Sequence, residues 1–106
     1  MKLGIVIYTN EPETVWNAFR LGVFSCKQGD TVSAFLLGMG VEAETLKSDK
    51  FDVVGQMRSF SEAGGSILAC GTCLKIRQSE GSDICPVSTM HDLHSLIQDS
   101  DKILSF

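Results

Sequence analysis

Apolar runs of strand length alternate along this chain with segments of helical periodicity, and this alternation restricts the folds that the chain can adopt. Residues 3–9 form a nearly continuous apolar run, which predicts a central parallel strand covered on both faces. Apolar residues then recur at helical spacing up to Cys26, and residues 31–37 begin a second strand. A strand, a helix and a second strand in this order form a right-handed crossover unit.

The two ends of the first helix carry capping signals. Asn10 and Glu13 resemble a capping box, and Pro12 is compatible with a first helical turn. We expect the helix to run to about Lys27, after which Gly29 supplies a left-handed stop.

The middle of the chain continues the alternation. Residues 42–50 are polar and have no clear period, which predicts a loop or short helix that acts as a lid. Residues 51–61 carry a helical stripe, which the glycines at 64–65 terminate. Residues 66–69 then form a short apolar run that suits a buried strand.

The last part of the chain predicts two further strands and a helix. Residues 83–87 suit a brief parallel strand that Pro86 cuts off, and residues 102–106 suit a final strand. Thr89 and Asp92 form a capping pattern. The buried stripe of the helix that follows is predicted to be Met90, Leu93, Leu96 and Ile97. We therefore expect one domain over residues 1–106, a three-layer α/β sandwich with helices on both faces of a mostly parallel sheet of four or five strands.

Composition and missing motifs narrow the function classes. Nine basic and thirteen acidic residues give a net charge of −4, which argues against nucleic acid or an anionic membrane because both require a basic face. No apolar run approaches the length of a membrane span, and the N-terminal run is interrupted too soon for a signal peptide, so we expect a cytoplasmic protein. Neither a hydrolase triad nor a phosphate loop is indicated. The partner is expected to be a small molecule or another protein.

The strongest chemical signal is the pair of thiols in Cys70-Gly71-Thr72-Cys73. The pair joins the strand at 66–69 to a helix expected from Leu74, and in an open α/β sheet that turn lies at the carboxyl edge, where ligands bind. Amides at the start of the helix stabilise a thiolate there, and Lys75 and Arg77 are candidates for lowering the thiol pKa further. Cys70 and Cys73 are therefore read as reactive thiols, although two small buried side chains are the alternative.

The other two cysteines have weaker claims to a function. Cys26 lies on the apolar stripe of the first helix and is assigned to the core, whereas Cys85 supplies a third thiol if its segment reaches the same edge as a strand. A zinc site made of Cys70, Cys73, Cys85 and His91 or His94 has irregular spacing, and a surface histidine pair explains those two side chains better. We therefore expect no metal and no cofactor.

The sequence resembles the DsrE/DsrF-like family of small sulfur-relay proteins, which also includes Tus-type subunits. The resemblance spans most of the chain and rests on the opening strand with residues 8–10, the Gly-Met-Gly-Val turn at 38–41, the strand that ends in Cys70, and the closing pattern at 92–93 and 101–106. It implies a flavodoxin-like fold and a homotrimer or homohexamer, which would supply the enclosure that a lone short domain lacks.

The resemblance also implies a chemistry, because the family cysteine at the end of the central strand carries a sulfane sulfur as a persulfide. Cys70 matches that position, which makes a sulfur carrier or sulfurtransferase, with a donor and an acceptor protein as partners, the leading hypothesis. Cys73 departs from members with only the first cysteine, and it would shield the persulfide or resolve it. The pocket at the carboxyl edge would be lined by Asn10, Gly38, Met39, Gly71 and Thr72. A thiol–disulfide oxidoreductase that cycles Cys70 and Cys73, and a non-catalytic oligomeric binding module, are the alternatives.

Overall fold

The computed structural model describes all 106 residues and has a five-stranded parallel sheet in the order β4-β3-β2-β1-β5. Along the chain the elements are β1 (Lys2–Ile7), α1 (Pro12–Lys27), β2 (Thr31–Leu36), the 3-10 helix η1 (Gly38–Thr45), α2 (Val53–Glu62), β3 (Ser66–Cys70), α3 (Gly71–Ile76), β4 (Val87–Ser88), α4 (Met90–Asp99) and β5 (Lys102–Ser105). The strands predicted from the apolar runs are present, and the sheet has the larger of the two predicted strand numbers.

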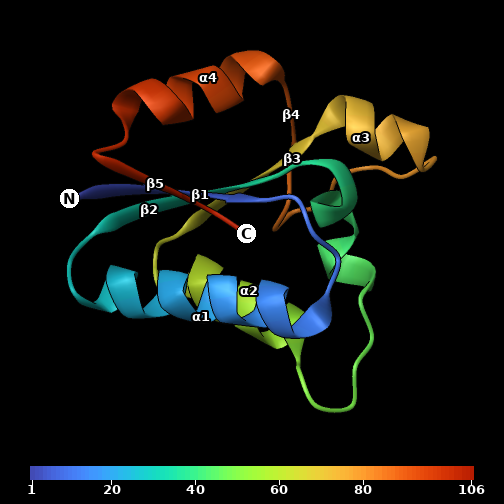
Figure 1. Cartoon of the computed structure of the whole chain (residues 1–106), viewed down its shortest axis with the longest axis horizontal. Helices are drawn as coiled ribbons and strands as arrows, with labels where there is room; N and C mark the ends of the chain where they lie inside the picture. The colour runs from blue at the N-terminus through green and yellow to red at the C-terminus, as the bar shows by residue number, and fades with distance from the viewer.

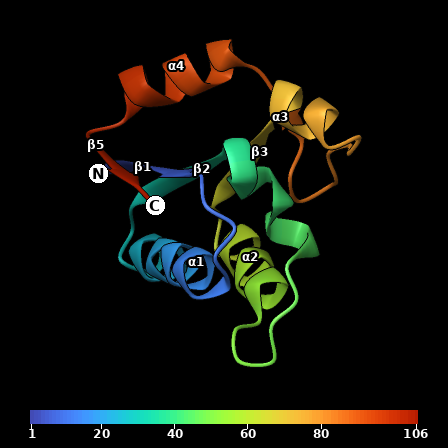
Figure 2. The same cartoon turned by 45° about the vertical axis from the view of Figure 1, so that its right-hand side comes forward.

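Helices cover both faces of this sheet, which confirms the three-layer α/β architecture. Figures 1 and 2 show α1 and α2 on one face, α4 on the other, and α3 with η1 at the carboxyl edge of the strands. Large side chains are buried between the sheet and the α1–α2 layer, where the rings of Phe19 and Phe60 meet edge to face with centroids 5.6 Å apart. Parallel pairing sets the register of β1, β2 and β3, so these strands end at the same edge of the sheet.

The α4 face is covered less completely than the apolar stripe of the helix predicts. Leu96 is buried and Leu93 is half-buried, but Met90 is 55% exposed and Ile97 is 49% exposed. The helix packs mainly against β1, so Leu93 and Leu96 face the sheet while Met90 and Ile97 stay at the surface. The prediction that all four side chains are buried is therefore wrong for the single chain.

Helix capping agrees with the sequence at α4 and differs at α1. Thr89 and Asp92 form the predicted capping box, and Gly29 has the expected positive φ of +94°. At α1, however, the Glu11 carboxylate rather than Asn10 accepts hydrogen bonds from the backbone N–H groups of Glu13 and Thr14. The longer side chain of Glu11 reaches the unpaired amides of the first helical turn, and the sequence does not reveal this because short side chains are the preferred N-caps.

The strand predicted at 83–87 lies later in the chain, at Val87–Ser88, because Pro86 precedes the strand instead of ending it. Pro86 does not end β4 but precedes it, and its carbonyl oxygen accepts a hydrogen bond from the N–H of Ala69 at 2.9 Å. Proline has no N–H to donate, and at the start of an edge strand it needs none. The segment after β2, predicted as a loop or short helix, contains a short helix: residues 38–45 form η1, and the chain that follows is irregular.

Candidate active site

Cys70 ends β3 and begins the next helix at the same time. Its backbone is extended, with φ −60° and ψ 117°, and it is the N-cap of α3, which starts directly at Gly71. The helix therefore begins earlier than Leu74, and no separate turn intervenes. Cys70 is 3% exposed, so its thiol is almost entirely enclosed.

Cys73 follows three residues later and faces η1. Its Sγ accepts a hydrogen bond from the backbone N–H of Gly38 at 3.2 Å, and the Cys70 thiol lies near enough to influence its pKa. Burial is the main reason that the pKa of the Cys73 thiol is raised, with the Cys70 thiol adding to it and the Gly38 N–H opposing it. The predicted help from Arg77 exists but is the smallest of these influences, so Cys73 is held as a neutral thiol.

A polar network fixes the helix that carries both thiols. Arg77 Nε donates to Glu42 Oε2 at 2.7 Å, and Arg77 Nη1 donates to the carbonyl oxygen of Cys73 at 3.1 Å. Asn10 Nδ2 donates to Glu42 Oε1 at 3.3 Å. Arg77 and then Asn10 lower the pKa of the Glu42 carboxyl. The network therefore links the end of β1, η1 and α3.

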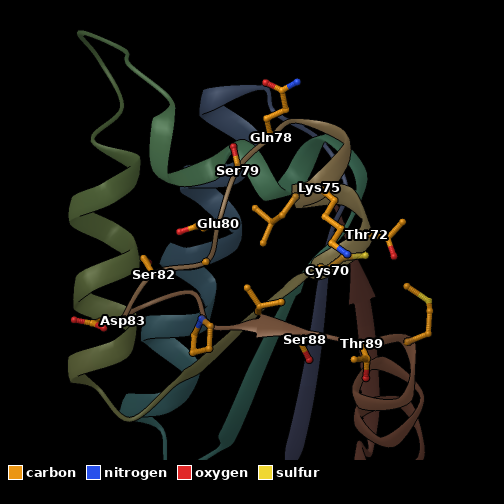
Figure 3. A pocket seen from close by; sticks show the side chains of 16 residues that line it. Cys70, Thr72, Lys75, Gln78, Ser79, Glu80, Ser82, Asp83, Ser88 and Thr89 are labelled. Carbon is orange, nitrogen blue, oxygen red and sulfur yellow. The ribbon is translucent and has the colours of Figure 1, made fainter.

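An open cavity of about 1050 Å³ lies on the other side of Cys70 (Figure 3). It is bounded by α3, the segment that leads to β4, and the start of α4. The lining residues are Cys70, Gly71, Thr72, Leu74, Lys75, Gln78, Ser79, Glu80, Gly81, Ser82, Asp83, Pro86, Val87, Ser88, Thr89 and Met90. The little exposed surface that Cys70 has therefore lies beside this cavity.

The structure divides the predicted pocket residues into two groups. Gly71 and Thr72 line the cavity beside Cys70, whereas Asn10, Gly38 and Met39 do not. Gly38 lies on the Cys73 side of α3, as its hydrogen bond shows, and Asn10 belongs to the Glu42 network. The backbone of α3 therefore separates two groups of residues that the strand order alone would place together at one edge of the sheet.

Ser88 is a site residue that the sequence does not reveal. It is the register partner of Cys70 in the pairing of β3 with β4, is 4% exposed and lines the cavity. Its hydroxyl donates to Asp92 Oδ2 at 2.5 Å, which is the main reason that the pKa of the Asp92 carboxyl is lowered. The sequence would have identified Ser88 only if it had predicted the two-residue strand after Pro86 and its register with β3.

Cys85 lies outside the cavity. It is buried beside Glu44 and Ser82, and burial followed by the Glu44 charge raises its pKa far above the usual range of a thiol. His, Cys, Asp and Glu side chains nowhere form a group of three or more that could hold a metal ion, so the zinc set considered from the sequence is not brought together. None of the helices is both long and apolar enough to cross a membrane.

Comparison with known proteins gives one family and one fold. A model of the DsrE/DsrF-like family matches residues 1–106. The uncharacterized protein MJ0989 of Methanocaldococcus jannaschii is 29% identical with full coverage of both chains. The uncharacterized protein MK0008 of Methanopyrus kandleri is 27% identical over 89% of this chain and 83% of its own.

Two solved structures share this fold. The crystal structure of the ychN protein from E. coli has a TM-score of 0.84, with 18% identity and full coverage of both chains. The conserved protein of unknown function BT1422 from Bacteroides thetaiotaomicron has a TM-score of 0.79 and 23% identity, covering 99% of this chain and 94% of its own.

Proposed function

This chain belongs to the DsrE/DsrF-like family, and on that premise we propose that it is a sulfur carrier that accepts sulfane sulfur on Cys70 as a persulfide and passes it to a partner. The observation that carries the proposal is a single thiol placed where a strand ends, a helix begins and a cavity opens. Structural scaffolding alone does not require a cysteine there, since any small side chain would fill the space.

The local backbone suits a sulfur anion at Cys70. No side chain caps α3, so the N–H groups of its first turn remain available to a thiolate or to the terminal sulfur of a persulfide. The Cys70 thiolate attacks the terminal sulfur of a persulfide donor, and the donor S–S bond breaks as the new S–S bond forms. The donor leaves as a thiol and takes the proton that Cys70 gave up. An acceptor thiol reverses the step and regenerates Cys70.

A second candidate function is thiol–disulfide exchange, and the influence of the Cys70 thiol on the pKa of Cys73 favours it, because it requires the two thiols to be near each other. Cys70 is the N-cap of α3 and Cys73 is the third residue of the same helix. A Cys73 thiolate that attacks Sγ of a Cys70 persulfide forms the Cys70–Cys73 disulfide and releases hydrogen sulfide. The raised pKa of Cys73 slows this reaction at neutral pH, because the thiolate is the attacking form. Carrying is therefore the leading function.

The two functions differ in how many cysteines they need. We would load the protein with a low-molecular-mass persulfide, remove the excess, add an acceptor thiol and follow the transferred sulfur. Cys70→Ser should abolish transfer and still fold, because serine is a preferred N-cap. Cys73→Ser should retain transfer. Loss of transfer in both variants, with disulfide formation in the wild type, would favour the oxidoreductase; transfer at full rate in Cys70→Ser would overturn both.

Assembly into a homotrimer or homohexamer in the cytoplasm is part of the same proposal. All four residues of the edge strand β5 are exposed, as are half of the apolar stripe of α4 and Phe24 on α1. These surfaces suit contacts between copies of the chain. Sedimentation at several concentrations tests the assembly. If the protein is oligomeric and Cys70 reacts no faster than free cysteine, the non-catalytic binding module takes the place of the carrier.

A further inference from the structure

The cavity beside Cys70 offers a ligand polar and charged groups as well as apolar surface. Only four of its sixteen lining residues are hydrophobic, although apolar atoms make up more of its exposed lining than polar atoms do. Its volume of about 1050 Å³ lies at the upper end of the usual range for small-molecule sites. Because Cys70 is 3% exposed, a reactant must enter the cavity to reach the sulfur.

The charges of the cavity are separated along its length. Lys75 is its only basic residue, and Glu80 and Asp83 are its only acidic ones. In Figure 3, the Lys75 side chain extends toward Cys70, whereas Glu80 and Asp83 lie at the opposite end. Side chains on a helix tilt toward its N-terminus, which brings the Lys75 ammonium group back toward the residue that caps α3.

These three charges have no partner within the chain. Both ion pairs of the protein lie elsewhere, so Lys75, Glu80 and Asp83 are free to interact with a ligand. Thr72, Ser79 and other lining residues have hydroxyl groups that offer hydrogen bonds to a polar ligand. A matching ligand has a carboxylate near its reactive sulfur and an ammonium group farther away.

Resting on the proposed carrier function, we propose that the sulfur donor is a small zwitterionic persulfide of short-peptide size. Its carboxylate pairs with Lys75, its ammonium group lies toward Glu80 and Asp83, and its terminal sulfur faces Cys70. Transfer forms the Cys70 Sγ–S bond, breaks the donor S–S bond and releases the donor as a thiol that carries the Cys70 proton. The donor itself supplies the sulfur at the required oxidation level, so no other oxidant is needed.

Three donors of similar size separate the contributions of the charges. Glycylcysteine hydropersulfide carries a carboxylate near the sulfur and an ammonium group farther away, N-acetylcysteine hydropersulfide carries only the carboxylate, and glycylcysteamine hydropersulfide carries only the distant ammonium group. We would measure the second-order rate constant for sulfur loading onto Cys70 by intact mass at low salt. Lys75→Met keeps the aliphatic stem and removes the charge, and Lys27→Met, at the far end of α1, is the matched control.

Relative to glycylcysteamine hydropersulfide, which has no carboxylate, Lys75→Met should slow loading by the two carboxylate-bearing donors about two- to fivefold, which corresponds to a solvent-exposed ion pair. The difference should shrink at high salt, and Lys27→Met should leave all rates unchanged. A variant with Glu80→Gln and Asp83→Asn should slow only the donors that carry an ammonium group. Equal loading by all three donors in every variant would overturn the charge selection and leave the carrier function intact. If no donor loads Cys70, the carrier function itself fails, and if only a protein persulfide loads it, the small-molecule donor is wrong.

Discussion

Gly40 is the position at which a single methyl group tests how η1 positions the thiol site. A Cβ at residue 40 collides with the carbonyl oxygen of Ile7, and that oxygen also accepts the backbone hydrogen bond from Leu37 at 2.9 Å. The backbone of β1 cannot yield easily, because β1 is an interior strand paired with both β2 and β5. Gly40→Ala therefore has to push η1 away from the sheet.

The cost follows from two contributions. Overpacking of this kind costs about 1–3 kcal/mol, and weakening the Leu37–Ile7 hydrogen bond costs about 1 kcal/mol. A total of about 2–4 kcal/mol lowers the Tm of a domain of this size by about 8–16 °C. Because η1 begins at Gly38, whose N–H binds Cys73 Sγ, the displacement should also expose Cys73 and relieve the burial that is the main cause of its raised pKa, so that it reacts faster with an alkylating reagent.

Calorimetry gives the first quantity, and alkylation mapped by mass spectrometry gives the second. Gly29→Ala is the control, because Gly29 has a positive φ and no neighbour within reach of a Cβ, so it tests backbone strain far from the site. It should lower the Tm and leave Cys73 unchanged. A Gly40→Ala protein that melts within a few degrees of the wild type, or whose Cys73 keeps its wild-type alkylation rate, would refute the proposed packing of η1 on β1.

Three further substitutions test the electrostatics and the core. Burial raises the pKa of Cys85 in the folded state, so the unfolded thiol ionises first as the pH rises. The resulting stability is fully present below about pH 8.5 and is lost above it by about 1.4 kcal/mol per pH unit. In denaturant titrations at alkaline pH, Cys85→Ala should lose stability with a shallower slope than the wild type, and an equal slope would contradict the burial of this thiol. Arg77→Met should raise the pKa of the Glu42 carboxyl toward its usual value, and an NMR titration in which that pKa does not move would rule out the ion pair as its main cause. Phe60→Ala should cost about 3–5 kcal/mol in urea unfolding, because the ring is fully buried against Phe19; a cost below about 1 kcal/mol would be inconsistent with that packing.

The sequence predicts the layers of this fold better than the shape of its site. The runs at 3–9, 31–37 and 66–69 have no plausible place except a buried sheet, so β1, β2 and β3 follow from hydrophobicity alone. The site instead depends on which side of α3 each thiol faces. That choice is made by tertiary contacts, namely the Gly38 N–H on Cys73 and the Arg77–Glu42 pair, which no local pattern encodes.

The sequence also fails to predict the cavity wall formed by the segment between α3 and β4, for a related reason. The segment between α3 and β4 has no periodicity, and it is placed by the positive φ of Gln78 and by the pairing of a strand only two residues long. Ser88 becomes the neighbour of Cys70 through that pairing. The exposed half of the α4 stripe has a different explanation, since amphipathic periodicity identifies an apolar face but does not say whether the same chain covers it.

The most direct test of the central claim is to locate sulfur on the protein itself. The purified chain is exposed to a persulfide donor, alkylated, and examined by intact-mass and peptide mass spectrometry. We expect one added sulfur atom on Cys70 that a reductant removes, with Cys73 and Cys85 still as thiols. A Cys70–Cys73 disulfide without any sulfur-loaded form, or a Cys70 that gains no sulfur under conditions in which free cysteine does, would contradict the assignment of this chain as a sulfur carrier.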